Sequence, residues 1–279
     1  MKRIRITVLL LSVSLLQACA VARLDDSLPR GIMNNDDLQL VEQGLPAYLL
    51  MLDGFIVNWP ESEGLLRSGA NLYSAYAGLF VEDDARARKL TQQALEYSMR
   101  AACVEHDELC ELRSRSVPEL EKALANMDAD DVPIIYNLGT TWAGYIQVRS
   151  SDWNAIASLG RVNVLLERSV ALDETYKQGQ GHMYLGVMNS FLPKSMGGRP
   201  EKAKRHFEQA IALSDGANLL AKVLYAQHYA RLAFDRKLHD RLLQQVLEED
   251  PQRDSLTLQN VYAQKEARAL LNESEDYFE

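Results

Sequence analysis

The sequence has few residues that interrupt regular structure and lacks the motifs by which many enzymes are recognised. Its 279 residues include only 15 glycines and 8 prolines, while 47% are hydrophobic and 25% charged, an ordinary globular composition. It has no His-Glu-x-x-His, Gly-x-Ser-x-Gly or Gly-x4-Gly-Lys-Ser/Thr motif. It also has no strand pattern of useful length and no Gly-x-Gly-x-x-Gly. We therefore predict an all-α protein that is not an enzyme and needs no cofactor.

Positive charge is also scarce. Lys and Arg total 30 against 39 Asp and Glu, and three of the positive charges, Lys2, Arg3 and Arg5, lie in the first eighteen residues, which hold no acid. The remainder carries 27 positive and 39 negative residues, a net charge of −12. This acidity argues against a nucleic-acid-binding protein and against general attraction to anionic membranes.

The first eighteen residues are predicted to be a targeting signal rather than part of the folded domain. Residues 1–18 combine a basic start with an apolar run, Ile6 to Leu16, that is too short for a comfortable transmembrane helix. The run ends Leu16-Gln17-Ala18-Cys19, which resembles the bacterial lipobox, so we predict removal of 1–18 and lipidation of Cys19. An ordinary signal peptide cut near Ala18 or Ala20 is the alternative.

The residues after Cys19 indicate where the protein sits. Ala20, rather than Asp, follows the cysteine, and by analogy with enteric bacteria this favours the outer membrane, facing the periplasm. Residues 19–35 are polar with Pro29 and Gly31, which suits a lipidated tether to a domain spanning 36–279.

The sequence does not decide whether the two further cysteines, Cys103 and Cys110, form a disulfide. The periplasm is oxidising, but seven residues along one straight helix would separate them by about 10 Å, so a bond requires a bend between them. His106 and two acids lie in the same stretch, yet the spacing matches no common zinc pattern, and we predict no metal site.

The stretch His182 to Asp215 is typical of a tetratricopeptide-like helical hairpin. Gly186 offers a small residue where a partner helix can approach, and Ala203, Phe207 and Ala210 share one face of the second helix. Pro200 fits the first turn of that helix. One hairpin cannot bury its apolar face alone, so we expect more of them.

Comparable units occur at 132–172 and 222–251, and a weaker one at 72–97. From Gly139 to Val162 there are 23 residues and from Gly186 to Ala203 there are 17, against about twelve in an ordinary repeat. We therefore predict a compact array of hairpins with inserts of about eleven and five residues between paired helices.

Outside these units we expect four further elements. They are helices at 36–43 and 46–59 separated by a break at Gly44-Leu45-Pro46, a capping helix at 256–271 and a polar tail at 272–279.

Two places can bind a ligand. The first helices of the hairpins are expected to line a groove suited to a mostly apolar small molecule. Its candidate residues are Tyr136, Thr140, Met183, Val187, Leu224, His228 and Arg231. Alternatively, these residues only pack against the inserts.

The second place is the loop before Pro200. Lys194, Gly197, Gly198 and Arg199 could hold an anion at the start of the following helix. A polar connecting loop is the plainer and favoured interpretation. The five histidines, at 106, 182, 206, 228 and 239, have no fixed carboxylate or cysteine partner in sequence, so we interpret them as surface or packing residues.

Several stretches resemble the T component (TatT) associated with tripartite ATP-independent periplasmic (TRAP) transporters. They include GLPAYLLMLDGFI from Gly44, DVPIIYNLGTTWAGYIQ from Asp131, and GGRPEKAKRHFEQAIALS from Gly197. The resemblance covers about residues 44–278. It implies a lipoprotein with tetratricopeptide-like hairpins, trimerisation, a hydrophobic cleft or pore, and association with a periplasmic substrate-binding protein.

We therefore expect a lipid-anchored scaffold that binds the substrate-binding protein of a TRAP system and passes an apolar carboxylate through its cleft. A generic scaffold for envelope assembly without a ligand is the first alternative. An envelope hydrolase with an unrecognised site is a second and weaker one.

Overall fold

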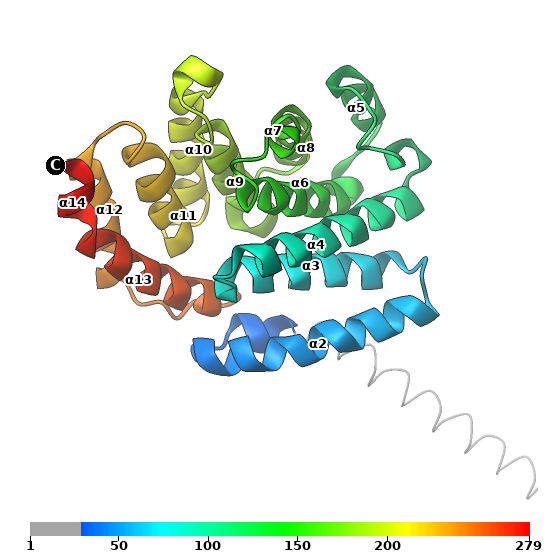
Figure 1. Ribbon diagram of the computed structural model, residues 1–279, viewed down its shortest axis with the longest axis horizontal. Coiled ribbons are helices and arrows are strands. Elements are labelled where there is room, and N and C mark those ends of the chain that lie inside the picture. Colours follow the sequence, from blue (N-terminus) through cyan, green and yellow to red (C-terminus); the bar gives the residue numbers. More distant parts are fainter. Residues whose placement is uncertain (1–28) are drawn as a thin grey trace, which may run out of the picture.

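A computed structural model describes residues 29–279, and these residues contain helices and no strands (Figure 1). The predicted signal segment and the lipidation site Cys19 lie outside the described residues. The all-α prediction is confirmed. Within the part expected as tether, residues 29–33 are helical, and the Asn34 side chain bonds to Asp254 and to the backbone N–H of Ser255.

The helices follow one another with short connections. The first half comprises α2 (Leu38–Asn58), α3 (Glu63–Phe80), α4 (Asp84–Glu105), η1 (Asp107–Leu109), α5 (Val117–Leu124), η2 (Ala129–Asp131) and α6 (Val132–Gln147). The second half comprises α7 (Trp153–Ile156), α8 (Leu159–Leu172), η3 (Tyr176–Gly179), α9 (Gln180–Asn189), η4 (Lys194–Met196), α10 (Pro200–Leu213), α11 (Leu219–Leu224), the π-helical η5 (Tyr225–Ala230), α12 (Arg236–Glu248), α13 (Thr257–Asn272) and α14 (Ser274–Phe278).

Helices pack in pairs, and the pairs pack side by side. α3 packs on α4, α6 on α8, α9 on α10, and α11 with η5 on α12, which are the pairs that the sequence units predict. Contacts of α4 with α6, of α8 with α9 and of α10 with α11 join the pairs into one array, and α13 packs on α12 (Figure 1). The tetratricopeptide-like character of the hairpins remains a prediction.

The close approach of a partner helix, expected at Gly186, is present there and at Gly139. A Cβ on Gly186 would lie 2.7 Å from the ring of Phe207, and a Cβ on Gly139 would lie 2.8 Å from Leu166. Because even alanine would collide there, glycine is what lets α10 and α8 seat a large side chain on their partner helices. Phe207 and Leu166 therefore occupy the same place in their two hairpins, each against a glycine of the first helix.

The segment between α6 and α8, predicted as an insert, contains α7, and the predicted insert between α9 and α10 contains η4. Both therefore form short helical segments rather than extended loops.

Buried amides accompany the apolar core between helices. Asn137 on α6 accepts a hydrogen bond from Ser98 on α4 and donates one to Asn71 on α3, at 2.6 and 2.8 Å.

The structure corrects two expectations near the ends of the domain. α2 runs unbroken through Pro46, whose missing N–H leaves one carbonyl without its helical partner, at exposed Glu42, where water can replace it. The C-terminal tail is helical, because the Phe278 ring packs 5.1 Å from His239 and 5.3 Å from Phe234. Its apolar anchor lies near the end of an otherwise polar segment.

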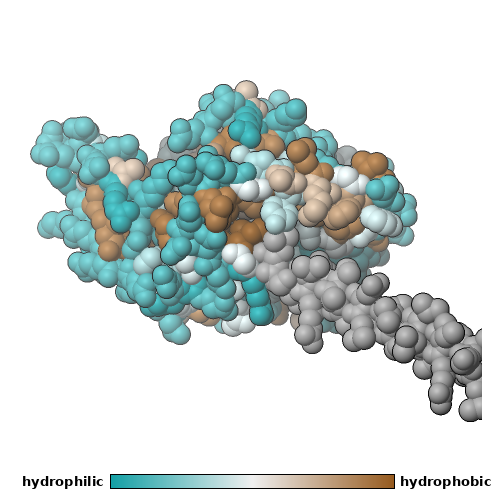
Figure 2. Space-filling model, turned by 90° about the horizontal axis from the view of Figure 1, so that it is seen from below, coloured by the Kyte–Doolittle hydropathy of each residue, from teal (hydrophilic) through white to brown (hydrophobic). Residues whose placement is uncertain are grey.

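α2 lies at one edge of the array, where one of its faces packs on α3 (Figure 1). Val41, Leu45, Leu49 and Ile56 are its buried residues. Within residues 29–279 it is the one helix long and apolar enough to cross a membrane by length and composition, with a mean hydropathy of 1.3. Seen from the α2 side, apolar side chains gather on this edge (Figure 2).

Candidate functional site

The seven predicted groove residues divide into a buried and a partly exposed group. Tyr136, Thr140, Met183 and Val187 are buried. The Thr140 hydroxyl donates to the Tyr136 carbonyl of its own helix at 2.9 Å, and Met183 packs with Ala210 and Ala221. These four residues therefore contribute to the packing between helices. Leu224, His228 and Arg231 keep partial exposure on the third hairpin.

Tyr136 is the centre of a polar and aromatic cluster that the sequence did not predict. Its ring lies 5.2 Å from that of Tyr176 and 6.2 Å from that of Tyr184, both edge-on, and its hydroxyl is 3.0 Å from the Gln180 side-chain oxygen. The Lys177 ammonium lies 5.5 Å from the centre of the Tyr136 ring, within cation–π range. We call these five residues the tyrosine–lysine cluster.

An unusual backbone presents Lys177 to the cluster. Lys177 and Gln178 have φ of 49° and 57°, and Gly179 follows at 75°, so three successive residues occupy the left-handed region. For the two non-glycine residues this conformation costs about 1–2 kcal/mol each. Packing fixes the turn, since a Cβ on Gly179 would collide with Leu213. Strain of this kind is typical of positions where a side chain must be aimed.

The electrostatics of the cluster favour an anion. Lys177 has no acidic partner within 4.0 Å among residues 29–279. Lys177 is exposed, and desolvation by neighbouring protein, followed by the charge of Arg67, lowers the pKa of its ammonium. Burial raises the pKa of Tyr136 and Tyr184, so both hydroxyls stay protonated, and that of Tyr136 donates to Gln180. A carboxylate beside Lys177 would offset the repulsion from Arg67.

The third hairpin places a histidine and an arginine in a distorted helix. His228 lies within the π-helical η5, and Arg231 follows it with its N–H bonded to the Ala226 carbonyl, five residues back. Burial lowers the pKa of His228 to about 4, so this side chain is neutral at pH 7. The Arg231 guanidinium lies 4.4 Å from the centre of the Tyr277 ring and 3.2 Å from Glu273, which ties η5 to the C-terminal helices.

The loop before α10 already uses its backbone donors. The N–H groups of Gly197, Gly198 and Arg199 donate to the carbonyls of Lys194, Pro193 and Asn189, at 3.2, 3.1 and 2.7 Å. A Cβ on Gly198 would overlap the Leu192 carbonyl, so glycine serves the tight turn there. This geometry supports the connecting-loop interpretation, with the Lys194 and Arg199 side chains beside it. Two hollows lie elsewhere, one of about 330 Å³ beside α5, lined by charges of both signs, and one of about 490 Å³ beside Met99 and residues 111–114.

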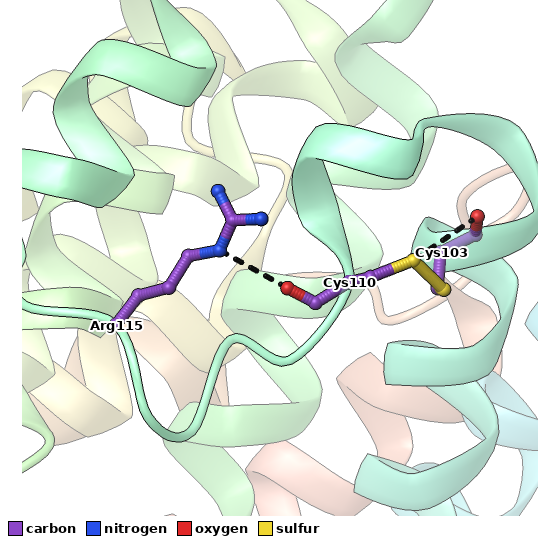
Figure 3. Close-up of a disulfide and its surroundings, with 3 residues drawn as sticks. All are labelled: Cys103, Cys110 and Arg115. Atoms are coloured by element: carbon purple, nitrogen blue, oxygen red, sulfur yellow. Dashed lines mark hydrogen bonds between the residues drawn. A yellow bond between two sulfur atoms is a disulfide. The ribbon is translucent and has the colours of Figure 1, made fainter.

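Cys103 and Cys110 form a disulfide, drawn in Figure 3. Their Cα atoms are 4.5 Å apart because α4 ends at Glu105, His106 is extended, and η1 turns the chain back. The Arg115 Nε donates to the Cys110 carbonyl at 3.1 Å and holds the far side of the turn. Among the described residues, no group of three or more His, Cys, Asp and Glu side chains lies close enough to hold a metal ion.

Two histidines have carboxylate partners, which corrects the expectation that no histidine has a fixed carboxylate or cysteine partner. His106 lies 2.9 Å from Asp131, and His239 lies 2.9 Å from Asp240. His182 and His206 face each other on α9 and α10 with their Nδ1 atoms 2.8 Å apart. Burial lowers the pKa of both, that of His206 to about 4, so at pH 7 one neutral ring donates to the other. Among residues 29–279, the hydrogen bonds of the histidine rings go to Asp131, to Asp240 and between His182 and His206.

The sequence contained one signal for the missed cluster. Tyr176-Lys177-Gln178-Gly179 precedes α9 directly, and a glycine after two polar residues can signal a left-handed turn. What the sequence could not supply was the partner, since Tyr136 lies about forty residues earlier, in the preceding hairpin.

Comparison with known proteins gives two similarities. A family model described as "TRAP transporter T-component" matches residues 34–278. An uncharacterised protein of Treponema pallidum (strain Nichols) is 25% identical over 272 residues, covering 91% of this chain and 84% of that protein.

Proposed function

The chain belongs to the TRAP transporter T-component family, and from this premise we propose that it is a non-enzymatic, lipid-anchored scaffold within a TRAP-type uptake system. Membership gives it a role in a TRAP transporter system and a place in the envelope or periplasm. Our proposal adds that it binds the periplasmic substrate-binding protein. It also adds that the protein passes a hydrophobic carboxylate along the first-helix side of its hairpins, as a trimer by family resemblance.

The anchoring part of the proposal rests on the sequence. A basic start, a short apolar run and Cys19 support lipidation, and Ala20 supports the outer membrane. More than one acyl chain on Cys19 would give lasting attachment, because a single chain binds only reversibly.

One observation carries the ligand part of the proposal, and that is the tyrosine–lysine cluster. It combines an ammonium without an acidic partner among residues 29–279, two protonated phenols and three aromatic rings at the junction of α6, η3 and α9. A carboxylate head with an apolar body complements that set, because the Lys177 ammonium and the Tyr184 hydroxyl can donate to the head and the rings can contact the body.

The partner proposal is tested by affinity capture from membranes of the native organism. The tagged, lipidated chain is expected to retain a periplasmic substrate-binding protein together with TRAP membrane subunits. Repeated capture without any substrate-binding protein would count against the scaffold role, provided that the bait remains folded and membrane-bound.

Replacing Lys177 by glutamine tests the ligand. Affinity for dodecanoate, measured by calorimetry, is expected to fall roughly tenfold or more, because a charge-assisted hydrogen bond is worth about 1.5–3 kcal/mol. Glutamine is uncharged and one atom shorter than lysine, and the substitution leaves the tyrosines in place.

Lys237→Gln is the matched control. Lys237 is exposed on α12, outside the tyrosine–lysine cluster, so its loss changes net charge equally without touching the cluster. Equal weakening in both variants would indicate non-specific attraction. No binding by the native chain would favour the alternative of a scaffold without a small ligand, which the burial of four of the seven groove residues also favours.

A further inference from the structure

The outward face of α2 exposes large apolar side chains to an unusual extent. Leu50 is 72% exposed and Val57 is 79% exposed, and Trp59, just after the helix, is 58% exposed. Leu40, Met51 and Phe55 lie on the same side of the helix. In Figure 2 the corresponding edge carries apolar side chains between more polar flanks. A contiguous exposed patch of this kind marks an interaction site.

This face is also free of charge. From Gly44 to Pro60 the sequence has a single charged side chain, Asp53. Asp53 points to the core, where its two oxygens accept hydrogen bonds from Tyr73 and Tyr97 at 2.6 and 2.7 Å. The domain as a whole is acidic, so an uncharged strip of about four turns is a local exception.

We propose that the outward face of α2 lies on the lipid leaflet that holds the acylated Cys19, with the helix axis along the membrane surface. The proposal rests on the lipid anchor of the proposed function and adds an orientation of the domain. Cys19 and Pro29 are ten residues apart, a span of at most about 35 Å, so the domain stays close to the leaflet.

The chemistry of the face favours lipid over a protein partner. Protein interfaces make about one hydrogen bond per 100–200 Å², whereas the exposed positions of α2 are mostly Leu, Met, Phe, Val, Gly and Ala. At the C-terminal end, Phe55 and Trp59 pack 6.1 Å apart, and Arg100 donates to the Pro60 carbonyl at 2.7 Å. An indole beside a guanidinium suits the level of lipid headgroups.

α2 lies on the membrane rather than across it, because its other face belongs to the core. Leu45, Leu49 and Ile56 are almost completely buried against the array. Insertion would pull these residues, and Asp53 with its two tyrosines, out of the folded domain. Contact through one face requires no such change, and it is the geometry of an interfacial helix.

The test uses the full lipidated chain in vesicles of phosphatidylethanolamine and phosphatidylglycerol whose acyl chains are brominated near the headgroup. The chain has three tryptophans. Trp142 is buried, whereas Trp59, just after α2, is 58% exposed and Trp153, on α7, is 64% exposed, and these two helices lie at opposite sides of the array in Figure 1. Bromine quenches indole only at close range, so each exposed tryptophan reports its own face.

We expect the Trp153→Phe chain, which keeps Trp59, to lose most of its exposed-tryptophan emission on brominated vesicles. The Trp59→Phe chain, which keeps Trp153, should lose none. Adding Leu50→Glu and Val57→Glu to the Trp153→Phe chain should abolish the quenching, and circular dichroism verifies that this variant folds.

Two outcomes would overturn the proposal. One is a vesicle-bound chain in which Trp59 is not quenched. The other is a Val57→Cys chain that crosslinks efficiently to itself on vesicles while Trp59 stays unquenched, which would assign the face to a second copy. Failure of the lipid anchor itself is distinguishable, because the chain would then not float with the vesicles at all.

Discussion

Replacing Phe207 by alanine is expected to lower the free energy of unfolding by about 3–5 kcal/mol, measured by urea denaturation. The side chain is fully buried, its ring lies against Gly186 on α9, and it stacks on Tyr225 of η5 with ring centres 5.2 Å apart. Its removal leaves a cavity shared by three helices. The neighbours cannot close it, because Gly186 has no side chain to fill the space.

Phe55→Ala is the control for this experiment. It removes the same atoms from the outward face of α2, where Phe55 is 40% exposed, and should cost about 1 kcal/mol or less. If the two substitutions cost the same, the packing of α10 on α9 would not be the feature that holds the array together.

Removing the disulfide by the double substitution Cys103→Ala and Cys110→Ala is expected to cost about 2–3 kcal/mol, because the bond closes a short loop in the unfolded chain. The turn that it closes also positions Leu109 and Leu112, which are 1% and 2% exposed. Their burial beside α4 should persist in the variant, so we expect lower stability with an unchanged helical content.

Reduction supplies the matched comparison. Dithiothreitol should destabilise the native chain by the same amount and leave the double variant unchanged. A native chain whose unfolding midpoint does not respond to dithiothreitol would show that the bond contributes nothing to stability.

The pairing of helices could be predicted from the sequence because each hairpin is local. Phe207 and Leu166 occupy equivalent positions in two stripes, and both bury against a glycine on the preceding helix. A spacing of three and four residues, with glycine opposite, determines this contact without knowledge of the remaining chain.

The candidate ligand site could not be predicted in the same way. Tyr136 was identified by its position on a first helix, but its contacts with Tyr176 and Lys177 depend on a left-handed turn and on the packing of one hairpin against the next. The break expected at Pro46 failed for a related reason. Burial of Leu45 and Leu49 outweighs the local preference of Gly-Leu-Pro for a turn.

The π-helical turn at Tyr225–Ala230 predicts how homologous sequences align with this one. A π turn holds one residue more than an α turn, so it corresponds to a single inserted residue inside the first helix of the third hairpin. The sequence predicts inserts between the helices of the 132–172 and 182–215 hairpins, whereas the extra residue of the 222–251 hairpin lies within a helix. Homologues without that insertion should align with a one-residue gap at 225–230. In them, residues after the gap would be rotated by about 100°, and the counterpart of Arg231 would no longer reach the C-terminal helix.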